Sequence, residues 1–312
     1  KERPHTKITS PGRNPLNNCM IDLITVVYRP EMPFLELQAK SIETYFEQDF
    51  VNSIQVVVND DDSVCDLINK AWWGKYQDRV NIVPYSLYNY ECRVNGWENQ
   101  QLCKLLAASQ SQQTWAMILD AKTLFVKPCT PELMFTGDKV NSHPIEIFPQ
   151  FIEAKESIQN IFGISFDETV GPGGVPFMMH SDTVRDMIKY IETTAETTFT
   201  DFFQTKCRYP NLITEFYLYS GYVTFKYGNI LELYSGQQNW DCANLADWQI
   251  DQFDDVYQTM RLFKTLTVSI QAQAWNILSQ QQKLLYVRLL KFKKLIDNEN
   301  YTLDKLNTVV IN

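Results

Sequence analysis

The chain lacks several patterns by which common protein classes are recognised. Its seven cysteines stand at irregular positions without a Cys-x-x-Cys pair, so free thiols in a reducing compartment are expected rather than disulfides. No apolar run reaches the roughly 18 residues that a membrane-spanning helix needs. The first residues, KERPHTKITSPGRNP, also lack the apolar stretch of a signal peptide. We therefore expect a cytoplasmic protein without a transmembrane segment.

The sequence also lacks the common nucleotide-binding motifs. No G-x-G-x-x-G follows the first apolar run and no G-x-x-x-x-G-K-[ST] occurs, which argues against a dinucleotide fold and a P-loop nucleotidase. A net charge of -9 argues against a surface made wholly for nucleic acid. Apolar residues are plentiful: 45% of the 312 residues are hydrophobic, enough for one large domain or a domain with an appendage.

Strands and helices alternate in the first half of the chain. Apolar runs at 20–28, 53–58, 80–84 and 115–119 predict buried strands, and helices are expected near 33–46, near 64–73 and from about residue 95. This alternation predicts a mostly parallel sheet with right-handed crossovers. Further along, the pattern predicts helices at 145–164, 183–193, 211–219 and 279–296 and a strand at 222–227.

The helix that follows Asn95 has two unlike faces. At about 100° per residue, Leu102 and Leu105 share an apolar face, whereas Trp97, Gln100 and Lys104 fall within a narrow arc on the opposite face. One face is expected to pack against the core, and the other is available to a ligand.

Polar residues follow three of the predicted strands where each strand ends. The run 115–119 leads directly into Asp120 and Lys122, Arg29 follows the first strand, and Asn59 and Asp60 follow the second. In open α/β sheets ligands bind in the crevice at the carboxyl ends of the strands, so these residues are candidates for binding a nucleotide. The alternative is that they only cap helices and form turns.

Two stretches resemble one protein family. Gly96-Trp97, Gln100-Gln101, Lys104-Leu105 and Ile118–Thr123 with Phe125 resemble a family of glycosyltransferase-like proteins of bacteria and phages, catalogued largely as a domain of unknown function. The run Thr214–Tyr219 resembles a later acidic and aromatic motif of that family. The resemblance spans about 20–251 with gaps.

The resemblance implies a fold and an activity. The expected fold class is α/β, a GT-A-like nucleotide-sugar-binding domain at 1–250 with a mostly parallel central sheet flanked by helices, and a C-terminal strand and helix extension at 251–312 packed on it. The expected activity is transfer of a sugar from a nucleotide-diphosphate donor to a glycan or other hydroxyl acceptor. The donor-binding residues that we predict are Arg29, Asn59, Asp60, Trp97, Gln100, Gln101 and Lys104.

The turn after the fourth strand departs from the family pattern. The family's Asp-x-Asp holds a divalent metal on the donor diphosphate, whereas here the second acid is replaced by Lys122. We hypothesise that Lys122, with Lys104, takes the electrostatic role of the metal while Asp120 orients the lysine or accepts a hydrogen bond from the donor. No cofactor is expected, and Mn²⁺ or Mg²⁺ only if the Asp120 turn binds metal. The stretch Thr267–Gln271, where many such enzymes have a metal-binding histidine, contains none. The alternative is a surface ion pair between Asp120 and Lys122.

Inverting transfer requires a base near the acceptor hydroxyl. Glu215 is the candidate, because it stands in the family-like motif among aromatic residues. The alternative is a glutamate that caps a helix or pairs with Arg208. A glycine-rich loop can cradle a ligand, and aromatic rings can stack on sugars, although both features are also common in turns and cores. The acceptor-binding residues that we predict are Gly173, Gly174, Tyr219 and Trp240.

The predicted helix at 279–296 has an apolar stripe and a basic side. The stripe consists of Leu285, Leu289, Phe292 and Ile296, and the basic residues are Lys283, Lys291 and Lys294. The basic side is either a solvated face or a docking patch for an anionic acceptor or a membrane surface. Two alternatives to a glycan-directed enzyme stay open: a non-catalytic carbohydrate or nucleotide-sugar binding module, and an enzyme that modifies a base in phage DNA and contacts phosphates through this helix.

Overall fold

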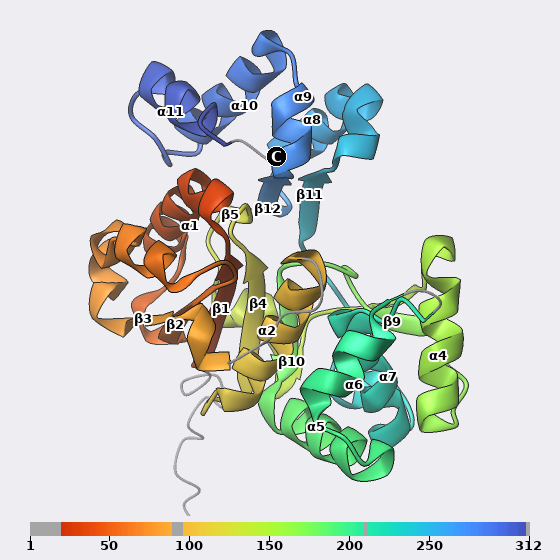
Figure 1. Cartoon of the computed structure of the whole chain (residues 1–312). Coiled ribbons are helices and arrows are strands. Elements are labelled where there is room, and N and C mark those ends of the chain that lie inside the picture. The colour runs from red at the N-terminus through yellow and green to blue at the C-terminus, as the bar shows by residue number, and fades with distance from the viewer. Residues whose placement is uncertain (1–19, 89–95, 209–210, 310–312) are drawn as a thin grey trace, which may run out of the picture.

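A five-stranded sheet runs through the centre of the molecule (Figure 1). The computed structural model describes residues 20–88, 96–208 and 211–309. The sheet has the order β10-β4-β1-β2-β3, with all neighbours parallel except β10, which runs antiparallel to β4. Its strands are β1 (Ile21–Val27), β2 (Val51–Val58), β3 (Val80–Val83), β4 (Trp115–Asp120) and β10 (Phe177–His180). The predicted α/β class with a mostly parallel sheet is confirmed.

The register of the sheet brings three strand ends together. In the central strand β1 every residue is buried, as expected for a strand covered on both faces. Val27 pairs with Val58 of β2, and Val26 pairs with Asp120 of β4. The residues that follow β1 and β2 therefore lie at the same edge as Asp120, which we call the carboxyl edge.

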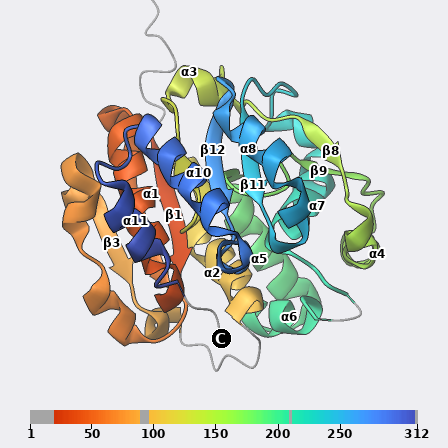
Figure 2. The same cartoon turned by 90° about the horizontal axis from the view of Figure 1, so that it is seen from above.

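Helices cover both faces of the sheet. The helices α1 (Met32–Tyr45) and α2 (Gly96–Gln110) connect strands of the parallel part, and α4 to α7 form a group beside β10 (Figures 1 and 2). The helices of the middle of the chain are α3 (Pro131–Met134), α4 (Ile152–Phe162), α5 (Ser181–Ala195), α6 (Phe199–Lys206) and α7 (Glu215–Tyr227). A short hairpin pairs β6 (Phe135–Thr136) with β7 (Lys139–Val140). β8 (Pro144–Glu146) and β9 (Glu168–Val170), which precede and follow α4 in the chain, pair antiparallel.

Three local predictions were wrong. The segment at 64–73 lies in two 3₁₀ helices, Asp62–Leu67 and Lys70–Arg79, and the helix predicted at 145–164 is confined to α4 because β8 uses the first residues to pair with β9. The strand predicted at 222–227 is the second half of α7. Its β-branched and aromatic residues suit a strand, but Tyr219, Tyr222 and Val223 recur at helical spacing and are buried, so tertiary packing outweighs local propensity.

A smaller C-terminal part lies beyond the carboxyl edge, at the top of Figure 1. Its sheet has the order β11-β12-β5, from β11 (Asp241–Leu245), β12 (Thr265–Ile270) and β5 (Leu124–Phe125). Its helices are α8 (Phe253–Arg261), α9 (Ala272–Ile277), α10 (Gln280–Phe292) and α11 (Glu299–Leu306). Their apolar side chains form a second core together with Phe34 and Leu37 of α1. β11 belongs to this sheet although it precedes the predicted boundary at 250, and a division into two domains stays a prediction.

No helix within the described ranges combines the length and the apolar character that crossing a membrane requires.

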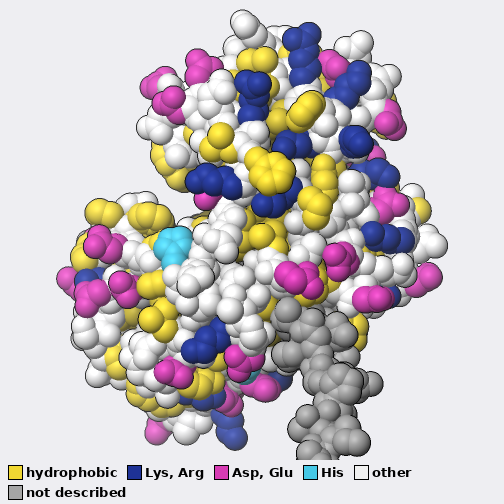
Figure 3. Space-filling model, turned by 180° about the vertical axis from the view of Figure 1, so that it is seen from behind, with side chains coloured by type: hydrophobic (Ala, Val, Ile, Leu, Met, Phe, Trp, Pro, Cys, Tyr) yellow, Lys and Arg dark blue, Asp and Glu magenta, His cyan; other side chains and the backbone are white. Residues whose placement is uncertain are grey.

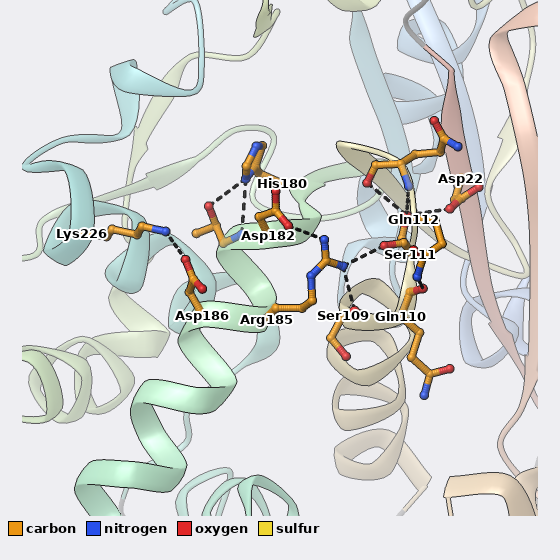
Figure 4. Close-up of polar contacts among 12 residues, drawn as sticks. Asp22, Ser109, Gln110, Ser111, Gln112, His180, Asp182, Arg185, Asp186 and Lys226 are labelled. Atoms are coloured by element: carbon orange, nitrogen blue, oxygen red, sulfur yellow. Dashed lines mark hydrogen bonds and ion pairs between the residues drawn. The ribbon is translucent and has the colours of Figure 1, made fainter.

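The opposite edge of the main sheet, the amino edge, carries a compact polar cluster (Figure 4). Asp22 is buried and accepts hydrogen bonds from Asn52 Nδ2 at 2.8 Å, Ser53 Oγ at 2.7 Å and Ser111 Oγ at 2.6 Å. Arg185 of α5 donates to the backbone oxygens of Ser109 and Ser111 at 2.9 and 2.8 Å and pairs with Asp182. The cluster ties the starts of β1 and β2 to the loop before β4 and to α5.

Candidate functional site

Five charged side chains form a continuous line at the carboxyl edge. Lys104 Nζ lies 2.7 Å from Asp120 Oδ1 and 3.0 Å from Glu215 Oε1. Lys122 Nζ lies 3.3 Å from Glu31 Oε1 and 3.4 Å from Asp120 Oδ2. The order along this charge network is therefore Glu31, Lys122, Asp120, Lys104, Glu215, with Asp120 at its centre.

The turn after β4 is held from two sides. The Thr123 N–H donates to the Asp120 carbonyl at 2.9 Å and closes the turn. The buried Gln38 of α1 donates through its amide to the carbonyls of Asp120 and Thr123, at 2.6 and 3.1 Å. Because the backbone is fixed at both ends of the turn, Asp120 and Lys122 are held within ion-pair distance of one another.

The start of α7 is positioned by α2. Thr214 caps α7 through its side chain, and Glu215 is the first residue of the helix. The buried Gln101 accepts the Glu215 N–H at 3.2 Å, and Lys104 one turn later pairs with the Glu215 carboxylate. Gln101 orients Glu215 and lines neither of the cavities described next, and its role in donor binding stays a prediction.

Two cavities meet at the charge network. The first, of about 600 Å³, lies at the ends of β1 and β2, and the second, of about 380 Å³, lies beside the glycine-rich loop and the start of α7. Residues that line only the first include Tyr28, Glu31, Asn59, Asp60, Gln100 and Trp248. Residues that line only the second include Phe151, Gly173, Gly174, Val175, Glu215 and Tyr217. Residues common to both are Trp97, Lys104, Asp120, Lys122 and Gln271.

Four of the predicted donor-binding residues besides Lys104 line the first cavity: Asn59, Asp60, Trp97 and Gln100. Asn59 Nδ2 donates to the Gly96 carbonyl at 2.8 Å, which joins the end of β2 to the start of α2. Gln100 Nε2 donates to Asp120 Oδ1 at 2.9 Å, whereas the Trp97 ring is open to solvent, with the residue 54% exposed. Trp97 is therefore the residue of this set that is free to contact a flat ligand.

Arg29 does not line either cavity. Its guanidinium donates to Ser63 Oγ at 2.7 Å and lies 3.5 Å from Asp61 Oδ2, in the loop after β2. This side chain ties the loops after β1 and β2 to each other, and its role in donor binding stays a prediction.

The predicted acceptor-binding residues divide into two pairs. Gly173 and Gly174 line the second cavity. Gly173 has φ +76°, where a residue with a side chain would be strained, and its Cβ would also displace Ile145 Cδ1, 2.8 Å away. Tyr219 and Trp240 are buried, at 0% and 2% exposure, and the prediction that they stack on a sugar was wrong. The Tyr219 hydroxyl accepts the His180 N–H and bonds to a second buried tyrosine.

The network contains three carboxylates and two ammonium groups, and burial acts on all of them. Burial raises the pKa values of Glu31 and Glu215, and their lysine partners offset this only in part. For Asp120 burial is the largest influence, but Lys104 and Lys122 outweigh it and hold its pKa well below the usual range. Burial would lower the pKa of each lysine, yet the neighbouring carboxylates raise both pKa values, so Lys104 and Lys122 are charged.

The two lysines are held differently. The contacts of Lys104, at 2.7 and 3.0 Å, have the length of charge-assisted hydrogen bonds, whereas those of Lys122, at 3.3 and 3.4 Å, are longer. The Lys122 side chain is 15% exposed and that of Lys104 only 5%. Among the described residues, Glu31 Oε2 has no hydrogen-bond partner although it is buried. Lys122 with Glu31 is thus the part of the network that can respond to a ligand.

The side chains at Asp120 do not suit a divalent metal ion. An ammonium group stands beside each of its carboxylate oxygens, where it would repel a second cation. In the ranges that the structure describes, no three His, Cys, Asp or Glu side chains stand together as a metal site would require.

Two residues of the site escaped the sequence analysis. Glu31 was overlooked because Arg29 stands nearer the end of β1, although an acidic residue in the turn between a strand and a helix was visible in the sequence. Gln271 follows β12, and only the missing histidine was noted there. Both residues can be recognised as part of the site once the structure shows that Glu31, after β1, and Gln271, after β12, line the same cavity.

Comparison with known proteins places the chain in a family. Residues 22–288 match the family described as "Family of unknown function (DUF6492)", and the chain belongs to this family. This confirms the resemblance to a family catalogued by an unknown function. No curated protein sequence matches the chain.

Several solved glycosyltransferase structures are similar to this chain. The galactosyltransferase LgtC, in complex with donor and acceptor sugar analogues, is 10% identical, with 89% of this chain and 97% of that chain covered and a TM-score of 0.49. GlyE of Streptococcus pneumoniae TIGR4 is 9% identical, with 91% and 62% covered and a TM-score of 0.44. The bifunctional WbbM is 8% identical, with 95% and 53% covered and a TM-score of 0.47. At these identities and TM-scores no activity carries over to this chain.

Proposed function

We propose that the chain is a glycosyltransferase that moves a sugar from a nucleoside-diphosphate donor to a hydroxyl acceptor without a resident metal ion. The observation that carries this proposal is the meeting of two cavities at the charge network. A transferase needs separate places for donor and acceptor and a charged group between them, where the bond to the leaving group breaks.

The first cavity is assigned to the donor. It lies beyond the carboxyl ends of β1 and β2, where ligands of parallel sheets bind, and Trp97 offers an exposed ring at its wall. Asn59 and Asp60 stand where the base or ribose would lie. Lys122 is placed to face the diphosphate, because it lines both cavities and its ion pairs are the long ones in the network.

The second cavity is assigned to the acceptor. Glu215 lines it with the carboxylate held by Lys104 Nζ, and a raised pKa suits a general base. In an inverting transfer the acceptor oxygen attacks the anomeric carbon and its proton passes to Glu215. The electron pair of the breaking glycosidic bond leaves with the diphosphate, whose added negative charge Lys122 stabilises.

The decisive test is ligand-induced stabilisation without metal. A donor that binds only the folded state raises the melting temperature. We expect a nucleoside-diphosphate sugar to do so equally with and without EDTA, and the Lys122→Met variant to lose both this shift and sugar transfer. Lys189→Met is the matched control, because Lys189 is exposed on α5 and lies away from both cavities.

Two results would redirect the proposal. Complete inhibition by EDTA with rescue by Mn²⁺ would discard Lys122 as the replacement for a metal. Binding of nucleotide sugars without turnover, for a broad panel of hydroxyl acceptors, would favour a binding module over an enzyme.

A further inference from the structure

Two phenylalanine side chains of the C-terminal part are exposed to solvent. Phe263, between α8 and β12, is 93% exposed, and Phe292, at the end of α10, is 79% exposed. The sequence pattern placed Phe292 in one apolar stripe with Leu289, but the buried residues of α10 are Tyr286, Val287, Leu289 and Leu290. The structure therefore presents two large apolar rings that the core does not use.

Lysines join the two rings into one patch. Lys127 Nζ lies 5.6 Å from the centre of the Phe263 ring, and Lys293 Nζ lies 6.0 Å from that of Phe292. Tyr45 contacts the backbone of both segments: its hydroxyl donates to the Lys293 carbonyl at 2.6 Å, and its own carbonyl accepts the Cys129 N–H, two residues after Lys127, at 2.9 Å. In agreement with this, the pKa of Lys293 is lowered by burial and then by the charge of Lys127. We call Lys127, Phe263, Phe292 and Lys293 the basic aromatic patch.

The patch keeps its positive charge unpaired. The nearby Lys264 and Lys291 form ion pairs with Asp241 and Glu299. Within the described part of the chain, neither Lys127 nor Lys293 has a carboxylate at ion-pair distance. Two like charges held together without a counter-charge favour an anionic partner.

The charge of the whole chain is distributed unevenly. Between 241, where β11 begins, and 309 there are eight Lys and Arg and eight Asp and Glu, whereas the complete chain has 28 against 37. Figure 3 shows dark-blue basic side chains gathered on the upper, C-terminal part of the molecule, with yellow hydrophobic side chains among them. The C-terminal part is thus electrically neutral on an acidic protein.

We infer that the basic aromatic patch binds the surface of an anionic phospholipid membrane. Interfacial binding needs apolar groups that enter the headgroup region and cations that meet lipid phosphates, and the patch supplies both side by side. The phenylalanine side chain has no polar group that needs a hydrogen-bond partner, and its transfer from water to an apolar environment is favourable. A second copy of the chain is a poorer partner, because a symmetric dimer through the patch would bring lysines against lysines. A polyanion such as DNA or heparin is also a poorer partner, because it would neutralise the lysines but leave the phenylalanine rings in water unless unstacked bases covered them. The inference is independent of the proposed transfer reaction.

Vesicle flotation tests this inference on the complete chain. We expect the wild type to float with vesicles of equimolar phosphatidylglycerol and phosphatidylcholine, and not with phosphatidylcholine alone, at low salt. Lys127→Gln with Lys293→Gln should lower the partition coefficient about 30-fold, as two lost charges imply. Phe263→Ser with Phe292→Ser should lower it at least about tenfold.

The matched control is Lys189→Gln with Lys206→Gln, which removes two charges from α5 and α6 and should keep flotation unchanged. Donor-induced stabilisation should be the same in every variant, since the patch lines neither cavity. The inference would be overturned if the protein bound both vesicle types equally or bound neither. It would also be overturned if only the lysine variant lost binding and the wild type bound DNA or heparin tightly. A dimer that dissociates in the phenylalanine variant would also overturn it.

Discussion

The two edges of the main sheet both bury charge, but they do so in different ways. At the amino edge Asp22 Oδ1 accepts two hydrogen bonds and Oδ2 accepts a third, all from side chains of neighbouring segments. At the carboxyl edge Glu31 Oε2 has no partner among the described residues, Lys122 makes only long contacts, and cavities open on both sides. A polar cluster that serves the fold satisfies its own atoms, and one poised for a ligand leaves some unsatisfied.

The largest expected effect concerns Glu215. Glu215→Gln keeps the shape of the side chain but cannot accept the acceptor proton, so transfer should slow by about 10² to 10⁴-fold while donor binding persists. Single-turnover assays with saturating donor and acceptor, together with donor thermal shifts, measure the two effects separately. Wild-type transfer rates in this variant would show that the base lies elsewhere.

Lys122 offers the sharpest contrast between the two edges. Lys122→Met should lower kcat/KM by about 10² to 10³-fold, the usual effect of losing a group that stabilises developing negative charge. Arg185→Met, in the amino-edge cluster, should lower the melting temperature and leave kcat/KM of the folded protein unchanged. If both variants lose activity in proportion to stability, the distinction between the edges fails.

Matched carboxylate-to-amide changes test the same distinction through stability. Asp22→Asn should cost about 2 to 3 kcal/mol in urea unfolding, because the new amide cannot accept all three hydrogen bonds of Asp22. Glu31→Gln should cost at most about 1 kcal/mol, because it removes an orphan charged oxygen and leaves two carboxylates facing two ammonium groups. A larger cost for Glu31→Gln would mean that this carboxylate serves the fold.

The smallest effect is a shift in the pH profile of transfer. A base acts in its ionised form, so activity should fall as pH drops through the raised pKa of Glu215. Lys104 opposes that rise, and Lys104→Gln should therefore move the acid limb of kcat/KM to higher pH. Glu31→Gln is the control and should leave the acid limb in place, since Glu31 is at the other end of the network. If Lys104→Gln leaves the acid limb unmoved, the acid limb does not report the ionisation of Glu215.

The fold was predictable from the sequence where one local pattern decided the outcome. The runs that became β1 and β4 are mostly apolar, because both strands are buried along nearly their whole length. Those that became β2 and β3 contain polar residues that are partly or fully exposed, but enough apolar residues remain to predict a strand. The prediction failed for residues 222–227, where a β-like composition was packed as a helix against α4 and α5. Gly221 makes that packing close, since a Cβ there would stand 2.3 Å from Ile158 Cγ2.

The candidate site was predictable in part for the same reason. Asp120, Lys122, Asn59 and Asp60 line the first cavity because a residue after a parallel strand is placed by the strand itself. Tyr219 was predicted to contact the acceptor but is buried, since composition does not say which face of a helix is covered. Apart from the sugar stacking of Tyr219 and Trp240, which their burial contradicts, the role of each predicted residue in binding or catalysis stays a prediction. The acceptor, the cytoplasmic location and binding of nucleic acid stay predictions too.

By itself the sequence determined that the first half forms a mostly parallel sheet, which polar residues follow its strands, and that Lys122 stands in place of the second acid. These depend on residues close together in the chain. Only the tertiary structure decided that Glu31, Lys104 and Glu215 join Asp120 and Lys122 in one network, and that Phe263 and Phe292 stay outside the core. The reason is that ion pairing and burial depend on distances between segments, which are set by how helices and sheets pack rather than by any local pattern.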